Sequence, residues 1–197
     1  MSDPHFFGYG SLVNRRTHGY GPTHPATLSG WRREWRATLL RPAAFLTARP
    51  VPGGAVDGLI APVPGGDWAA LDLRETGYDR VPATGVAHGL DHAPPIAVYS
   101  IPPADDGPAG ARPILLSYLD VVVQGFLQVF GEAGADRFFA STDNWALPVA
   151  DDRKAPLYPR AQSLAPAERR FVDSRLDDLG CARVDVARTG LGHDAAP

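Results

Sequence analysis

Two short segments contain the residue types that could do chemistry. The first, Phe7–Leu12, reads FGYGSL, an apolar strand that leads into a loop with two glycines. The second, Leu71–Tyr78, reads LDLRETGY and places one carboxylate, Glu75, where an amphipathic stretch meets a Gly-Tyr turn. Glycines let backbone amides converge on an anion, and a positioned carboxylate can move protons. The pair predicts an anion-binding loop that faces a general acid/base.

In order and separation, these segments resemble the γ-glutamylcyclotransferase-like family. The resemblance extends from Phe6 to about Gly125, roughly two-thirds of the chain. Its pieces occur in the order Gly8–Leu12, Leu28–Arg33, Gly58–Ile60, Glu75 before Gly77-Tyr78, Tyr99, and Pro113 with Tyr118 and Gly125. It implies an α+β fold, a small mixed β-barrel with flanking helices. It also implies an enzyme, of the transferase or lyase kind, that releases 5-oxoproline and uses Glu75 as its catalytic residue.

The implied reaction suits these residue types. The α-amine of a γ-glutamyl compound must attack its own side-chain carbonyl, so the enzyme folds the substrate and moves protons. Glu75 would take a proton from the α-ammonium and return it to the departing amine, with a pKa raised by burial. Nucleophile and electrophile lie in one substrate, so we expect no cofactor and no metal. The substrate-binding candidates are Tyr9, Gly10, Ser11, Leu12, Tyr78, Tyr99 and Tyr118, with backbone amides of the loop and the Ser11 hydroxyl as anion donors.

Taken singly, the same residues have simpler interpretations. A Gly-Tyr-Gly-Ser run is usually a strand-to-turn junction, and a glutamate at a helix end is usually solvated or paired, here with Arg74 or Arg80. Tyr99 and Tyr118 are more typical of core residues with satisfied hydroxyls than of ligands. The i, i+4 pair His88 and His92 would suit a metal only on a helix, which Gly89 and two nearby prolines disfavour.

Four arginines, Arg32, Arg33, Arg36 and Arg41, lie in or just after the strand expected over 26–40. Strand alternation sends only one of Arg32 and Arg33 inward, where it could bind a substrate carboxylate. Arg36 and Arg41 are expected to be solvated.

The substrate is less clearly indicated than the reaction. The Ser-Leu form of the loop and the Arg-Glu before Gly-Tyr are similar to the ChaC-type, glutathione-degrading branch, but the run expected of that branch after Trp35 is missing. Glutathione is therefore not favoured. The region after Gly125, including Asn144-Trp145 and Tyr158–Arg160, matches neither branch, and we expect a pocket for the leaving amine there. The alternatives are a noncatalytic small-molecule-binding or regulatory domain of the same fold, and a γ-glutamyl-removing enzyme of a biosynthetic pathway.

Composition bounds the wider context. The 197 residues, 44% hydrophobic and 21% charged, fit a single cyclotransferase-like domain over 1–197, with a divergent C-terminal extension over 140–197 packed on it. A net charge of −3 gives no reason to bind nucleic acid, and no stretch resembles a leader or a membrane span, so we expect a cytoplasmic protein with a small-molecule substrate. The single cysteine, Cys181, cannot form an internal disulfide. The segment 151–160 is predicted to be a surface loop, with a lid or a homodimer contact as alternatives.

Residue patterns predict the elements that position these groups. Strands are expected over 5–13, 26–40 with a break at Gly30, 55–63, 81–90 and 96–101, with a hairpin turn at Gly53-Gly54. Helices are expected from Asp67 to Gly77, over 113–139 in two pieces separated near Gly131 and Gly134, and over 166–179. The end of the chain, 189–197, is expected to fray.

Overall fold

The computed structural model describes residues 2–102, 112–189 and 191. The strands are β1 (His5–Gly8), β2 (His24–Arg36), β3 (Phe45–Pro62), β4 (Asp79–Pro82), β5 (Val86–His88), β6 (Ile96–Ser100), β7 (Ile114–Leu115), β8 (Thr142–Asp143), β9 (Val149–Asp151) and β10 (Arg183–Asp185). The α-helices are α1 (Ala69–Arg74), α2 (Leu116–Ala140) and α3 (Pro166–Asp178). Short 3-10 turns are η1 (Ser11–Val13), η2 (Arg15–Thr17), η3 (Pro64–Gly66) and η5 (Val186–Arg188).

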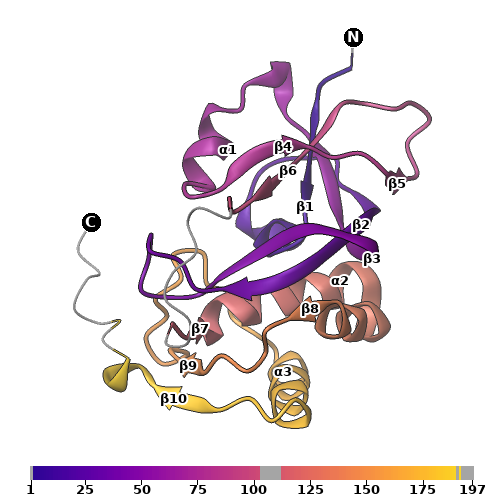
Figure 1. Ribbon diagram of the computed structural model, residues 1–197. Helices are drawn as coiled ribbons and strands as arrows, with labels where there is room; N and C mark the ends of the chain where they lie inside the picture. Colours follow the sequence, from indigo (N-terminus) through magenta and orange to yellow (C-terminus); the bar gives the residue numbers. More distant parts are fainter. Residues whose placement is uncertain (1, 103–111, 190, 192–197) are drawn as a thin grey trace.

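The main sheet is mixed, as expected for an α+β fold. Its strand order is β4-β6-β1-β3-β2-β5, with β8 paired to β2 outside this path, and β10-β9-β7 form a second sheet. Figure 1 shows α2 lying beside the β2–β3 hairpin, with α3 and the second sheet on the far side of α2. Among the described residues no pairing joins the outer strands β4 and β5. The α+β class is confirmed, whereas the closed barrel implied by the family resemblance is not detected.

The β2–β3 hairpin is the longest element, and it corrects one prediction. The prediction of a hairpin turn at Gly53-Gly54 is wrong, because β3 continues through these residues and the chain reverses direction over 37–44. The glycines instead let the two strands bend together. The register shifts between Ser29 and Trp31, where Gly30 has φ +79°, and a Cβ on Gly54 would lie 2.5 Å from the Trp31 carbonyl oxygen. The predicted break at Gly30 is confirmed.

A buried arginine joins this hairpin to the glycine loop. Arg33 is fully buried, and its Nε donates to the Tyr9 carbonyl oxygen at 2.9 Å. Its guanidinium also lies 4.9 Å from the centre of the Phe126 ring on α2. Arg32 points the other way and pairs with Asp143 at 2.7 Å, so the predicted alternation is confirmed. With all its contacts inside the fold, Arg33 holds the backbone beside the loop in place.

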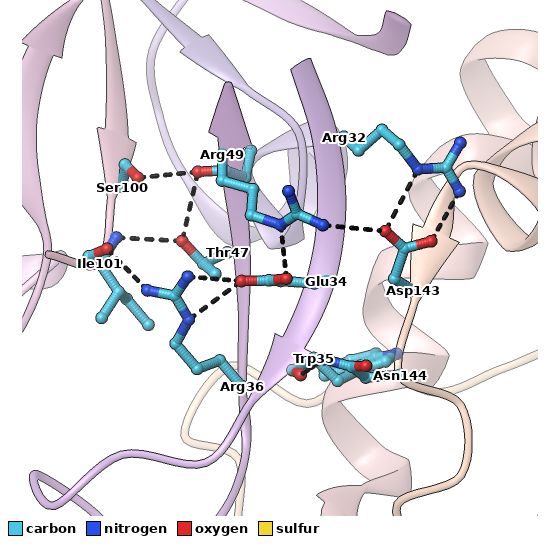
Figure 2. Close-up of polar contacts among 11 residues, drawn as sticks. Arg32, Glu34, Trp35, Arg36, Thr47, Arg49, Ser100, Ile101, Asp143 and Asn144 are labelled. Atoms are coloured by element: carbon cyan, nitrogen blue, oxygen red, sulfur yellow. Dashed lines mark hydrogen bonds and ion pairs between the residues drawn. The ribbon is translucent and has the colours of Figure 1, made fainter. Parts of the chain in front are cut away.

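The opposite face of β2 carries a polar network (Figure 2). Glu34 is buried and accepts from Arg36 Nε at 3.0 Å and from Arg49 Nε at 2.7 Å. Arg36 also donates to the Ile101 carbonyl oxygen at 3.0 Å, and Arg49 lies 3.5 Å from Asp143. The expectation that Arg36 is solvated is therefore wrong: its charge is used to tie β2 to the end of β6.

The strand predicted over 81–90 is divided. Residues up to Pro82 form β4, which pairs with β6, whereas Val86–His88 form β5 and pair with β2 on the other side of the sheet. Gly85 between them has φ +76° and lets the chain change direction.

The helical predictions for the C-terminal half are confirmed. Helix α2 is interrupted at Gly131, which has φ +68° and ψ −173°, and α3 begins at Pro166. The Asp152 carboxylate accepts from the Ser117 amide at 2.7 Å and the Leu157 amide at 2.9 Å, which anchors the following loop to the start of α2. Side chains of α3 and β9 share one core with the main sheet. The division at residue 140 stays a prediction.

No helix in the described ranges is long and apolar enough to cross a bilayer. The predicted fraying of 189–197 falls mainly outside the described residues.

Candidate functional site

A cleft opens where the glycine loop, the end of α1, the start of β3 and the start of α2 meet. Its inner recess, about 20 Å³, is lined by residues of the loop Gly8–Leu12 together with Leu46, Glu75, Tyr78, Tyr99 and Tyr118. The recess continues into an outer cleft of about 420 Å³, and the two share Ser11, Leu46, Glu75, Tyr78 and Tyr118. The outer volume is in the range of small-molecule sites.

Glu75 is held by the end of α1. Its amide donates to the Leu71 carbonyl oxygen at 2.9 Å, and its own carbonyl accepts from the Tyr78 amide at 3.0 Å. Gly77, with φ +97°, allows this tight return. The Glu75 side chain is only 16% exposed, and burial raises its pKa, as the sequence predicted. The nearby charges of Arg74 and Arg160 lower that pKa by a smaller amount.

Arg74 links Glu75 to the glycine loop. Its side chain is 8% exposed, and its Nε lies 3.0 Å from Glu75 Oε1. The same guanidinium donates to the Thr17 carbonyl oxygen at 2.8 Å and to Ser11 Oγ at 3.1 Å. Because Ser11 Oγ accepts this bond, its own hydroxyl proton stays available for another acceptor. The sequence offered Arg74 or Arg80 as a possible partner of Glu75 in the simpler interpretation; the partner is Arg74, and both side chains are largely buried.

The loop approaches Tyr118 closely. A Cβ on Gly10 would lie 2.8 Å from the Tyr118 hydroxyl and 3.4 Å from Leu46 Cδ2, so glycine is the residue that leaves the recess open. Ser11 and Leu12 begin η1, and the first amides of a helix have no acceptor within it. Burial raises the pKa of Tyr118 well above its usual value, which keeps its hydroxyl protonated.

The hydroxyls of the other three tyrosines that line the recess are used by the protein. Tyr9 donates to the Tyr99 carbonyl oxygen at 2.6 Å, Tyr78 to the Leu46 carbonyl oxygen at 2.9 Å, and Tyr99 to Asp72 Oδ1 at 2.5 Å. Tyr99 is thus a core residue with a satisfied hydroxyl, one of the two readings considered. These rings shape the recess, and Tyr118 is the tyrosine whose hydroxyl lies beside Gly10.

The outer cleft receives residues from a distant part of the chain. Tyr158, Pro159 and Arg160 line it together with Leu73 of α1 and Phe45 of β3. The Tyr158 ring packs edge-on against Tyr118, with ring centres 4.9 Å apart. Sequence reasoning had placed a leaving-amine pocket in this region but had not identified Arg41, Phe45 or Leu73 as neighbours. No local pattern marks these three, because their proximity arises from the packing of separate elements.

Two pairs of residues that the sequence suggested as candidates for a pocket or a metal site lie outside the cleft. Asn144 donates to the Trp35 carbonyl oxygen at 3.0 Å, and the Trp145 ring packs on Trp35 and Phe139, so this pair belongs to the core and not to the cleft. His88 lies on β5 and accepts from the Leu90 amide, not on a helix facing His92. Within the described part of the chain there is no cluster of three or more side chains suited to a metal ion.

Comparison with known proteins identifies the fold. No family model and no curated protein matches the chain. A solved structure described as a gamma-glutamyl cyclotransferase superposes with a TM-score of 0.56 at 15% identity, over 88% of this chain and 99% of that one. The uncharacterized protein loc79017 from Homo sapiens gives a TM-score of 0.56 at 14% identity over the same shares.

A third solved structure is longer than this chain. YkqA from Bacillus subtilis gives a TM-score of 0.56 at 17% identity, over 70% of this chain and 53% of its own, so the match spans about half of YkqA. The resemblance to γ-glutamyl cyclotransferase structures is therefore confirmed for the fold.

Proposed function

We propose that this protein is a γ-glutamyl cyclotransferase, which converts a γ-glutamyl compound into 5-oxoproline and a free amine or peptide. The observation that supports the proposal best is the inner recess. It brings a buried carboxylate, Glu75, together with the backbone of Gly10 and Ser11 at one end of a small-molecule cleft.

The recess can supply both proton transfers of the reaction. Glu75 accepts a proton from the substrate α-ammonium, and the freed α-amine attacks the side-chain carbonyl carbon. A ring C–N bond forms, the original amide C–N bond breaks, and Glu75 returns the proton to the departing nitrogen. The ring nitrogen then gives up its second proton through Glu75 to the released amine, which leaves as an ammonium ion. A carboxylate whose pKa is raised by burial is suited to this shuttle, because a higher pKa makes it a stronger base toward the α-ammonium.

The loop would bind the anionic groups. The recess of about 20 Å³ has room for one small group, such as a carboxylate or a carbonyl oxygen. The amides of Ser11 and Leu12 and the hydroxyls of Ser11 and Tyr118 are the donors that we propose for it. Binding the carbonyl oxygen there would stabilise the negative charge that develops during attack.

The ion pair between Arg74 and Glu75 favours the second candidate, a noncatalytic binding domain. A carboxylate paired with a buried guanidinium is held in its charged form, which suits a structural role. We rank this candidate second because burial outweighs the arginines and the net effect is a raised pKa.

An assay of 5-oxoproline release distinguishes the cyclotransferase from the noncatalytic binding domain. The protein is incubated with γ-glutamyl dipeptides, γ-glutamylamines and glutathione, in parallel with Glu75→Gln and with the matched control Glu132→Gln, an exposed glutamate. Product from the wild type and the control but not from Glu75→Gln supports the proposal. Equal product from Glu75→Gln removes Glu75 from its role, and binding without any product supports the noncatalytic domain.

A further inference from the structure

The outer cleft contains an excess of positive charge. Its charged lining residues are three arginines, Arg41, Arg74 and Arg160, and the single glutamate Glu75. Arg74 and Glu75 pair with each other, which leaves Arg41 and Arg160. Neither guanidinium makes a hydrogen bond or an ion pair to any described residue, although Arg41 lies 5.8 Å from the centre of the Phe45 ring. These two guanidiniums give the cleft a net positive charge, which favours an anionic ligand.

The walls around these arginines are apolar. They are formed by Phe45, Leu46, Leu73, Leu115, Tyr158 and Pro159. Leu73 is 79% exposed and presents its side chain to the cleft. The outer cleft, about 420 Å³, is also far larger than the recess beside Glu75. A bulky apolar group would fill this space.

From these features we infer the class of the leaving group. The substrate is a γ-glutamyl conjugate of a bulky apolar amine that bears a carboxylate, and Arg160, assisted by Arg41, binds that carboxylate. This inference rests on the proposed function, because it places the reacting carbonyl at Glu75 and the leaving part in the outer cleft.

The position of Arg160 supports this assignment. Arg160 lies close enough to Glu75 to lower its pKa, so a group bound to its guanidinium stays near the reacting end of the substrate. The loop that carries Arg160 is anchored by the buried Asp152, which accepts from the Leu157 amide at 2.9 Å. Arg160 is therefore presented by a fixed segment. The γ-glutamyl α-carboxylate has its own donors in the recess, which leaves Arg160 for a second anion.

A matched pair of compounds tests the inference. γ-Glutamylphenylalanine and γ-glutamylphenethylamide differ only in the carboxylate of the leaving amine, and γ-glutamylglycine keeps the carboxylate but lacks the ring. We expect the wild type to prefer γ-glutamylphenylalanine over both in kcat/KM, by roughly 10- to 100-fold over the phenethylamide, as for a lost charged hydrogen bond. Arg160→Gln should abolish that preference, Arg160→Lys should restore part of it, and the exposed Arg170→Gln should retain it.

The outcomes separate this inference from the proposed function. Equal turnover of the matched pair by the wild type overturns the inference and leaves the function standing. A preference that survives in Arg160→Gln overturns the role of Arg160. If no compound yields 5-oxoproline, the proposed function fails, and calorimetric binding of the same two compounds to the wild type then tests the carboxylate subsite. Equal affinity for the two compounds overturns the subsite. Tighter binding of γ-glutamylphenylalanine, abolished by Arg160→Gln, supports it.

Discussion

Arg74 and Glu75 are adjacent in sequence, and their side chains pair inside the protein, with Arg74 Nε 3.0 Å from Glu75 Oε1. The same guanidinium contacts Ser11 Oγ at 3.1 Å. One side chain therefore fixes the spacing between the proposed acid/base and the proposed anion-binding loop.

Glu75→Gln should abolish the release of 5-oxoproline with little change in stability. The amide keeps the shape of the side chain but cannot accept and return a proton, and such transfers contribute about 100- to 10,000-fold to rates. The measurement is 5-oxoproline formation under single-turnover conditions, with thermal unfolding as the check on folding. A variant that retains more than about a tenth of the wild-type rate would contradict the role.

The raised pKa of Glu75 also predicts a pH-dependent stability. The pKa of Glu75 in the folded protein lies above its unfolded value of about 4.3. The contribution of Glu75 to the free energy of unfolding is therefore fully present below the unfolded pKa and is lost as the pH rises through the folded pKa. The free energy of unfolding of Glu75→Gln, relative to the wild type, should therefore increase over this window and then level off. Urea denaturation at a series of pH values tests this, with Glu132→Gln expected to show no such trend. A difference that is flat across the window would contradict burial of the charge.

Arg160→Gln should move the acidic limb of the kcat/KM profile to higher pH. Arg160 lowers the pKa of Glu75, so its removal raises the pH at which Glu75 becomes a base. The other ionisable groups that face Glu75 are unchanged in the variant; they are Arg74, Tyr9, Tyr78, Tyr99 and Tyr118. The profile is measured with γ-glutamylphenethylamide, which has no carboxylate to pair with Arg160. The control variant Arg170→Gln should leave the acidic limb in place. An unchanged acidic limb in Arg160→Gln would show that Arg160 does not act on Glu75.

Gly10→Ala should impair substrate binding more than folding. The added Cβ would lie 2.8 Å from the Tyr118 hydroxyl and must displace it, which narrows the recess. We expect kcat/KM to fall by about 10- to 100-fold and the free energy of unfolding to fall by at most about 1–3 kcal/mol. Gly89→Ala is the matched control, because nothing lies within 4 Å of a Cβ there. An active Gly10→Ala protein with normal kcat/KM would exclude the recess as the binding site.

The sequence by itself determined the local features of this protein. The break at Gly30, the two-part helix over 113–139 and the helix from Pro166 follow from short-range patterns of glycine, proline and apolar spacing, whereas the α+β class was implied by the family resemblance. The pairing of the glycine loop with Glu75 was also predicted, and both line one recess. The break and the helices could be predicted because each depends on a few neighbouring residues, and the loop and Glu75 could be linked because their order and separation resemble those of the family.

Tertiary structure decided what depends on residues far apart in the chain. Gly53-Gly54 is a plausible turn in isolation, and only pairing with the bent strand around Gly30 makes it a bend within β3. Arg36 pairs with Glu34 and donates to the Ile101 carbonyl oxygen because the fold brings the end of β6 beside β2 and β3. The outer cleft joins Phe45, Leu73 and Arg160, which belong to three separate segments. Contacts of this kind have no period or motif, so the leaving-group pocket could be located only in the folded chain.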